Sequence, residues 1–184
     1  MTKEVIVVIG AGGIGVAIAR RQGIGRTLLL ADWSESTLEK AAAVLRDASY
    51  SVETLATDVT SRASVRALAQ RAAALGPVTQ IVNTEGVSPN MAPVDKLLAV
   101  DLYGSAIVFE EFRSVVAPGG AGLIISSMAR HMMRPLPEAD EKQLALTPAD
   151  ELLALPCLQP SAIPNSMIAY MVAKRANFLR VQAE

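Results

Sequence analysis

The stretch VIVVIGAGGIG, residues 5–15, joins an apolar run to a turn rich in glycine. Its first five residues are all β-branched and predict a parallel strand buried on both faces. Gly10, Gly12 and Gly15 follow with the spacing Gly-x-Gly-x-x-Gly and lead into a helix expected over residues 14–22. Between a strand and a helix, this spacing is typical of a turn that binds the phosphates of a dinucleotide, whose charge the helix N-terminus favours. A glycine turn that serves only tight packing is the alternative.

The rest of the chain as far as residue 126 alternates between short apolar runs and amphipathic segments. Ser34 and Ser61 are placed to cap two helices, and Gly76-Pro77 ends the second of them. This alternation predicts an α/β fold with a Rossmann-type doubly wound parallel sheet and helices on both faces. The later strands are expected at 27–31, 52–56, 80–83 and 122–126, and the later helices at 34–48, 61–76, 93–117 and 166–183, with Pro118-Gly119-Gly120 ending the third of these helices.

The composition narrows the classes of function. With 184 residues, 51% of them apolar, the chain fits a single dinucleotide-binding domain over residues 1–184. Its 17 basic and 18 acidic residues leave no basic field for nucleic acid and no polybasic run for a membrane. No apolar segment reaches the length of a membrane span. The single cysteine, Cys157, suits a reducing compartment, so we expect a cytoplasmic protein.

Two acidic residues follow strands at the expected cofactor edge. Asp32 ends the second strand, 17 residues after Gly15. A carboxylate there can accept hydrogen bonds from the ribose hydroxyls of adenosine and would repel a 2′-phosphate. Because no arginine occurs in the next five residues, NAD is favoured over NADP; the alternative role of Asp32 is a helix cap. Asp58-Val59 ends the third strand, where the acid could accept from the adenine amino group or equally serve as a cap for the next helix.

Tyr170 and Lys174 carry the chemistry of proton transfer. They stand at positions i and i+4 of the last expected helix and therefore share a face. A nearby cation lowers the pKa of a phenol and so makes it a better base. A serine pair, Ser126-Ser127, follows the fifth expected strand and could hydrogen-bond to a substrate oxygen. The alternative for Tyr170 and Lys174 is a half-exposed helix face without a catalytic role.

Taken in order, these motifs resemble the short-chain dehydrogenase/reductase family of the classical type, over nearly the whole chain. The motifs that carry the resemblance are the glycine turn, Asp58-Val59, Asn83-Thr84-Glu85-Gly86, Asp101-Leu102-Tyr103-Gly104, Ile125-Ser126-Ser127 and Tyr170-Met171-Val172-Ala173-Lys174.

The resemblance implies a set of roles. Tyr170 would be the acid/base, Lys174 would tune it and hold the nicotinamide ribose, and Ser127 would orient the carbonyl, with Asp101 completing the catalytic set. It also implies a homodimer or homotetramer, because helices 93–117 and 166–183 resemble those that pair subunits. The residues expected to bind or support the cofactor are Gly10, Gly12, Gly13, Ile14, Gly15, Asp32, Trp33, Asp58, Val59, Asn83 and Gly86, together with Tyr170 and Lys174.

The chain departs from the family pattern in four places. The glycine turn is one residue shorter than the usual Gly-x-x-x-Gly-x-Gly. Glu85 stands where the family prefers alanine, and Asp101 stands where an asparagine supports a water relay behind the lysine. An aspartate could still bend the helix and hold water, but its charge would alter the site. Finally, Ser127 and Tyr170 are 43 residues apart instead of about a dozen.

That gap is an insertion, residues 128–165, which holds six of the ten prolines. Two short helices are expected in it, over 137–146 and after Thr147 as cap, with Pro148 at the first helical position. The insertion is similar to those of some hydroxysteroid dehydrogenases and carbonyl reductases. We expect a pocket for a bulky, steroid-like alcohol or ketone, with ordinary core packing as an equal alternative. The methionines that suggest this pocket are Met128, Met132, Met133, Met167 and Met171.

The lone His131 is expected to be a loop residue, and no metal site is predicted. The family sheet continues beyond the tyrosine helix, so we expect the chain to be C-terminally truncated. A catalytically silent NAD-binding sensor or scaffold is the main alternative function, favoured by Glu85 and Asp101. A methyltransferase shares the glycine turn and the acid after the second strand, but it would leave Tyr170 and Lys174 unexplained.

Overall fold

A computed structural model describes residues 3–183 of the chain. The chain divides into two compact units. The first runs up to Glu85 and includes Val108–Ile125, and the second comprises Gly86–Ile107 and the chain from Ser126 onward.

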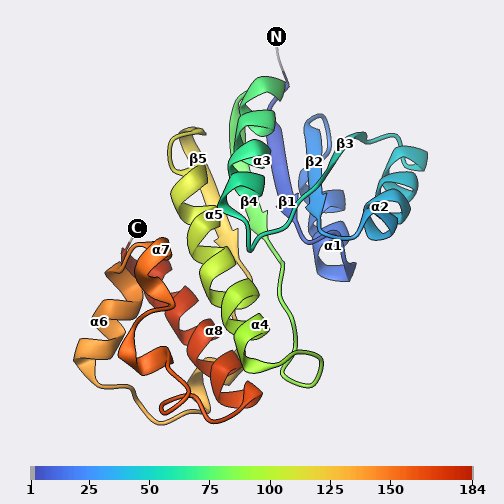
Figure 1. The fold of residues 1–184 in the computed structure, drawn as a ribbon. Helices are drawn as coiled ribbons and strands as arrows, with labels where there is room; N and C mark the ends of the chain where they lie inside the picture. The colour runs from blue at the N-terminus through green and yellow to red at the C-terminus, as the bar shows by residue number, and fades with distance from the viewer. Residues whose placement is uncertain (1–2, 184) are drawn as a thin grey trace. The chain divides into compact units, whose positions relative to one another are not determined.

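The first unit is built on a parallel sheet of five strands in the order β3-β2-β1-β4-β5 (Figure 1). Its strands are β1 (Val5–Ile9), β2 (Thr27–Asp32), β3 (Ser51–Ala56), β4 (Val78–Asn83) and β5 (Val116–Ile124). Its helices are α1 (Gly13–Gln22), α2 (Glu35–Asp47), α3 (Arg62–Leu75) and the later part of α5 (Ser105–Phe112). Every pair of neighbouring strands is parallel, so the predicted Rossmann-type sheet is confirmed.

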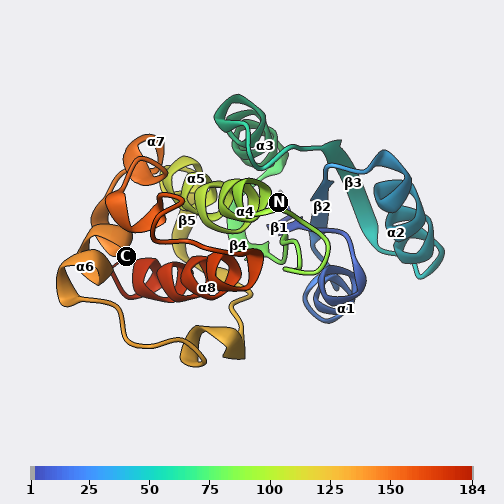
Figure 2. The same ribbon diagram turned by 60° about the horizontal axis from the view of Figure 1, so that its bottom comes forward.

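Alternate residues of the central strands pack against different helices. Val8 and Leu30 belong to a cluster with Ala19 of α1 and with Leu38 and Leu45 of α2. Helix α3 contacts β1 and β2 as well, and Figure 2 shows it on the opposite side of the sheet from α1. Right-handed crossovers produce this two-sided cover and bring the carboxyl ends of all the strands to one edge.

Two side-chain caps begin helices as the sequence predicts. The Ser34 hydroxyl accepts the backbone N–H of Thr37 at the start of α2, and the Ser61 hydroxyl accepts that of Ser64 at the start of α3. Each satisfies one of the N–H groups that a first helical turn leaves unpaired.

An ion-pair network joins α3 to α5 within this unit. Arg62 lies 2.6 Å from Glu110 and 2.9 Å from Glu111, and Arg66 lies 2.9 Å from Glu111. Hydrogen bonding to Arg66 and Arg62 lowers the pKa of Glu111.

The second unit is helical. Its elements are α4 (Val94–Leu97), the π-helix η1 (Leu98–Gly104), the start of α5, the 3₁₀ helices η2 (Met128–His131) and η3 (Pro156–Leu158), α6 (Glu138–Leu146), α7 (Ala149–Leu152) and α8 (Ser166–Ala183). Helix α8 contacts α4, η1, η2 and α6 (Figure 2). Arg180 anchors α6 to α8 by donating to the carbonyls of Leu144 and Thr147.

Three sequence-based boundaries are wrong. The third of the later helices ends at Phe112 instead of about residue 117, because Val116 already pairs with Val78 as the first residue of β5. Pro118-Gly119 lies inside β5, where the pairing shifts register and Gly119 takes a φ of +80°. The strand also ends at Ile124, two residues earlier than predicted.

The start of the second insertion helix also differs from the prediction. Pro148, not Thr147, precedes the first residue of α7, and Thr147 instead follows the last residue of α6. The backbone N–H of Thr147 donates to the Gln143 carbonyl, which explains its place at the end of that helix.

Candidate active site

Two glycines of the turn after β1 are required by packing. A Cβ on Gly15 would lie 2.0 Å from the Gly10 carbonyl oxygen, closer than any real contact. Gly10 has a φ of +91°, and a Cβ there would lie 2.6 Å from the Thr84 hydroxyl oxygen. Gly15 therefore lets α1 approach β1, and Gly10 makes the turn.

The other two glycines face open space. A Cβ on Gly12 or Gly13 would meet no atom within 4 Å. Gly12 precedes α1, and the helix has neither a side-chain cap nor an acidic residue in its first turn. The N-terminus of α1 therefore presents backbone N–H groups and a partial positive charge beside an open surface, which fits the phosphates of a dinucleotide.

Asp32 links the glycine turn to the start of α2. One carboxylate oxygen accepts the N–H of Ala11 at 2.9 Å, and the other accepts the N–H of Ser34 at 2.9 Å. The residue is buried, whereas the next one, Trp33, is 72% exposed. The carboxylate braces the turn, and each oxygen keeps a second lone pair for a further donor.

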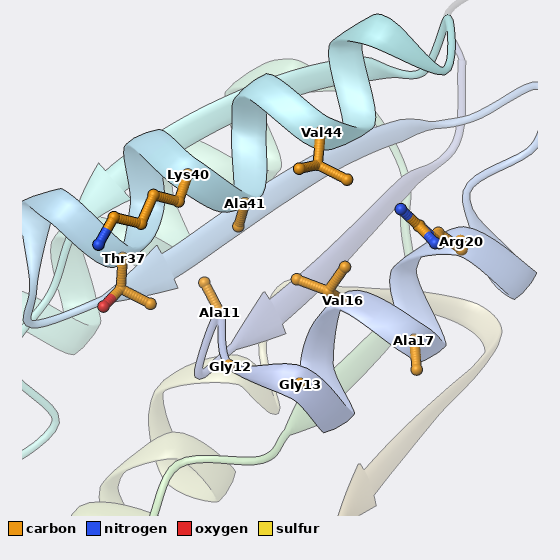
Figure 3. Close-up of a pocket in the computed structure, with 10 residues that line it drawn as sticks. All are labelled: Ala11, Gly12, Gly13, Val16, Ala17, Arg20, Thr37, Lys40, Ala41 and Val44. Atoms are coloured by element: carbon orange, nitrogen blue, oxygen red, sulfur yellow. The ribbon is translucent and has the colours of Figure 1, made fainter.

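A hollow of about 420 Å³ adjoins the glycine turn between α1 and α2 (Figure 3). Apolar side chains such as Val16 and Val44 form most of its wall. Thr37 and Lys40 stand at one end and Arg20 at the other (Figure 3). Two cationic side chains, Arg20 and Lys40, therefore line the hollow. Neither lies within the five residues after Asp32, so the sequence argument on NADP did not include them.

The remaining predicted cofactor residues of this unit lie at the carboxyl ends of β3 and β4: Asp58 and Val59 follow β3, and Asn83 is the last residue of β4. Asp58 is exposed, and its carboxylate accepts from both the N–H and the hydroxyl of Thr60. It makes a turn just before α3, while the cap itself is Ser61. Val59 is buried. Asn83 is buried too, and its side-chain oxygen accepts the N–H of Glu85, so it shapes the turn after β4.

The predicted proton-transfer residues all belong to the second unit. Tyr170 and Lys174 share one face of α8, with the Lys174 Nζ 5.5 Å from the centroid of the Tyr170 ring. Tyr170 is half-buried and Lys174 is buried. The structure therefore places an ammonium beside a phenol on one face of this helix.

The two serines have different partners. The Ser126 hydroxyl donates to the Lys174 carbonyl at 3.0 Å and so ties this segment to α8. The Ser127 hydroxyl accepts the N–H of Ala129 at the start of η2, which packs against α8. The Ser127 hydroxyl is therefore an acceptor within this segment, whereas the Ser126 hydroxyl is a donor.

Asp101 lies in the π-helix η1 and is completely buried. One carboxylate oxygen accepts the N–H of Val87 at 2.8 Å. The other lies 3.4 Å from Lys174 Nζ, an ion pair without a hydrogen bond of good geometry. Burial raises the pKa of the Asp101 carboxyl, although the Lys174 ammonium and the Val87 N–H both act to lower it. Gly86 closes over this pair, since a Cβ there would lie 3.2 Å from the carboxylate and 3.3 Å from Nζ.

Sequence reasoning missed Asn177. It is fully buried on α8, and its amide nitrogen donates to the Asp101 carbonyl at 2.9 Å. The Ser105 hydroxyl donates to the same carbonyl. The available signal was its position three residues after Lys174, which places both side chains on one face of the helix.

The insertion supplies mostly exposed side chains. Met128 and Met132 of the insertion are exposed; of the two methionines on α8, Met167 is exposed and Met171 is buried. His131 is exposed and accepts from the Arg130 side chain. Among the described residues, no group of three or more His, Cys, Asp or Glu side chains is arranged to hold a metal ion. Within residues 3–183, no helix is long and apolar enough to cross a membrane.

Comparison with known proteins identifies the family. The sequence model for short chain dehydrogenases matches residues 3–137. Together with the parallel sheet and the Tyr-x-x-x-Lys helix, this match shows that the chain belongs to the short-chain dehydrogenase/reductase family.

Two curated relatives are similar to the chain. The short-chain dehydrogenase/reductase bsc3 of Alternaria brassicicola is 36% identical over 183 residues, which are 99% of this chain and 66% of that protein. The cis-4-hydroxycyclohexanecarboxylate dehydrogenase of Sinomonas cyclohexanicum is 33% identical over 135 residues, 67% of this chain and 54% of that protein. The chain therefore spans about two thirds of the first relative and about half of the second.

Solved structures support the fold. A metagenomic short-chain oxidoreductase in complex with NADP has a TM-score of 0.71 and 26% identity, covering 98% of this chain and 74% of that one. A short-chain dehydrogenase/reductase from Serratia marcescens has a TM-score of 0.67 at 20% identity, covering 95% of this chain and 63% of that one.

Proposed function

We propose that the chain belongs to an NAD-dependent oxidoreductase that interconverts a secondary alcohol and a ketone. The observation that carries the proposal is the buried Lys174 on the same face of α8 as Tyr170, with Nζ 5.5 Å from the phenol ring. The Sinomonas relative is named as a dehydrogenase of a hydroxylated cyclohexane, whose reacting group is a secondary alcohol.

Tyr170, Lys174 and Ser127 have different roles in the proposed reaction. Bound nicotinamide would supply or accept the hydride. In alcohol oxidation Tyr170 takes the hydroxyl proton, and in ketone reduction it returns the proton, with the Lys174 ammonium 5.5 Å from the centroid of its ring. Ser127 donates a hydrogen bond to the substrate oxygen, which stabilises the negative charge that develops there.

The glycine turn and Asp32 are the proposed site for the adenosine half of the cofactor. The open N-terminus of α1 would hold the pyrophosphate, and the remaining lone pairs of Asp32 would hold the ribose hydroxyls. Trp33, Asp58, Val59 and Asn83 of the same unit would line or support this site, and Gly86 of the second unit is proposed to support the cofactor as well. The bulky hydrophobic substrate, the homodimer or homotetramer and the cytoplasmic location are further parts of the proposal, and the exposed methionines of the insertion support the first of them.

Cofactor choice gives a direct test. We expect NADH to bind at least about tenfold more tightly than NADPH, because the Asp32 carboxylate repels a 2′-phosphate. Titration of both cofactors by protein fluorescence or calorimetry measures the ratio. Lys40→Gln is the matched control: it removes a cation from the hollow beside the glycine turn and should leave the NADH dissociation constant within about twofold.

The opposite result would assign NADP. In that case NADPH binds more tightly than NADH, and Lys40→Gln removes most of the advantage. The metagenomic neighbour, which was solved with NADP, and the cations of the hollow make this second cofactor worth the comparison.

A panel of ketones tests the reaction itself. Consumption of NADH with bulky apolar ketones in preference to small polar ones supports the proposed substrate class. The second candidate function, a silent cofactor-binding protein, is supported by Glu85 and Asp101 at positions where the family has other residues. It predicts NADH binding without turnover of any ketone.

A further inference from the structure

We propose that the hollow between α1 and α2 is a second ligand site, separate from that of the cofactor. Its ligand is a small dicarboxylate, a molecule with an apolar chain between two acid groups. All the residues that line the hollow belong to the first unit. Binding of such a ligand does not depend on the proposed reaction.

The wall of the hollow suits the apolar chain of this ligand. Its volume of about 420 Å³ is within the range of small-molecule sites. Each helix lines it with residues three or four positions apart, which lie on one face of a helix. Val44 is 47% exposed, so a ligand that covers it removes apolar surface from water. The apolar side chains of the wall are Val16, Ala17, Ala41 and Val44 (Figure 3).

The charged side chains of the hollow are positive and stand at its two ends. Lys40 lies at one end with the Thr37 hydroxyl, and Arg20 lies at the other (Figure 3). No acidic side chain within residues 3–183 lines the hollow. The acidic residues of α2 lie outside the lining: Glu35, Glu39 and Asp47. Two cations at the ends of an apolar wall match a ligand with one acid group at each end of an apolar chain.

Both cations are available to a ligand. Among the described residues, the side chains of Arg20 and Lys40 have no ion-pair or hydrogen-bond partner. In contrast, five other arginines of the same unit each donate to an oxygen: Arg26, Arg46, Arg62, Arg66 and Arg71. A carboxylate that binds at either end of the hollow therefore gains a cation without breaking an existing ion pair.

The hollow meets the proposed cofactor site only at the glycine turn. Gly12 and Gly13 belong to its lining, whereas Asp32, whose oxygens are proposed to hold the ribose, does not. Arg20 stands seven residues after Gly13, which is roughly 10 Å along the axis of α1. The Arg20 end of the hollow therefore lies outside the part of the turn proposed for the pyrophosphate.

The test is a calorimetric titration of the whole chain with dicarboxylates from adipate to dodecanedioate, at pH 7 and fixed ionic strength, without cofactor. Octanoate, which has one acid group, and 1,8-octanediol, which has none, are the comparison ligands. We expect the dicarboxylate of best-fitting length to bind about threefold to fivefold more tightly than octanoate, because it gains one more exposed ion pair. The diol should bind more weakly than either acid.

Variants at exposed positions examine each part of the site separately. Arg20→Gln and Lys40→Gln should each lower the affinity for the dicarboxylate to about that of octanoate for the wild type. Val44→Ser should weaken the binding of both acids by a similar factor, because it removes part of the apolar wall. Arg21→Gln is the matched control: Arg21 is exposed and adjacent to Arg20 but does not line the hollow, so this variant should bind as the wild type does.

Three outcomes overturn the proposal. The first is a dicarboxylate series that binds no more tightly than octanoate at any length. The second is a loss in Arg21→Gln as large as that in Arg20→Gln, which shows an effect of overall charge. The third is a Lys40→Gln protein that binds NADPH about tenfold more weakly and the dicarboxylate unchanged, which assigns the hollow to the cofactor. The dicarboxylate titrations need no turnover, so a failure of the proposed reaction leaves their result intact.

Discussion

Tyr170→Phe should lower kcat/KM for ketone reduction by about 10³-fold, the range of a lost general acid. The change removes one oxygen from a half-buried residue on α8 and leaves the ring in place against the neighbouring Lys174. Without the phenol, no other described side chain on this face of the helix is placed to deliver the proton beside Lys174. Steady-state consumption of NADH with a ketone substrate measures the loss.

Tyr103→Phe is the control for this experiment. Tyr103 lies in the π-helix of the same unit, and its hydroxyl contacts the Asp150 carboxylate at 3.3 Å. We expect its activity to remain within about twofold of the wild type, because an exposed hydrogen bond contributes little. NADH affinity should be unchanged in Tyr103→Phe. A Tyr170→Phe protein that keeps its full rate would rule out Tyr170 as the acid.

Gly15→Ala should destabilise the protein by about 3 kcal/mol or more, at or above the upper end for overpacking. The added methyl would lie 2.0 Å from the Gly10 carbonyl oxygen, which is backbone and cannot rotate away. Helix α1 would have to move off β1, and both pack in the core of the sheet. Urea unfolding followed by circular dichroism measures the change.

Gly13→Ala separates binding from packing. A Cβ on Gly13 meets nothing within 4 Å, and alanine is the better helix former by about 1 kcal/mol. We expect unchanged or slightly higher stability, together with at least about tenfold weaker binding of NADH, because the methyl occupies the surface proposed for the phosphates. If Gly13→Ala binds NADH as the wild type does, the cofactor does not use this part of the turn.

The sequence predicts the sheet well because its central strands are simple. Val5–Ile9 and Thr27–Asp32 are nearly continuous apolar runs, and serine caps mark the helices that follow β2 and β3. The start of β5 could not be predicted in this way. Pro118-Gly119-Gly120 is typical of the end of a helix. In the structure these residues lie inside β5, where Gly119 has a positive φ and the pairing with β4 shifts register.

The sequence identified most residues of the candidate site but could not predict which of their side chains contact one another. The spacing of Tyr170 and Lys174 fixes their common face on a helix. Asp101 pairs with Lys174 from within the π-helix η1. The sequence indicated only that Asp101 could bend a helix, and it did not predict a π-helix. Asn177 follows the motif by three residues, and only the packing of α8 on η1 reveals that it holds the Asp101 carbonyl.

The network between α3 and α5 gives the first unit a particular weakness in acid. Glu111 is shared by two arginines, and its pKa is lowered in the folded state, chiefly by the hydrogen bond from Arg66. A carboxylate with a lowered pKa stabilises the fold above the pKa of an unfolded glutamate and loses that contribution as pH falls through the folded value. Once Glu111 is protonated, its ion pairs with Arg62 and Arg66 weaken together, so the join between these helices should loosen as the pH falls.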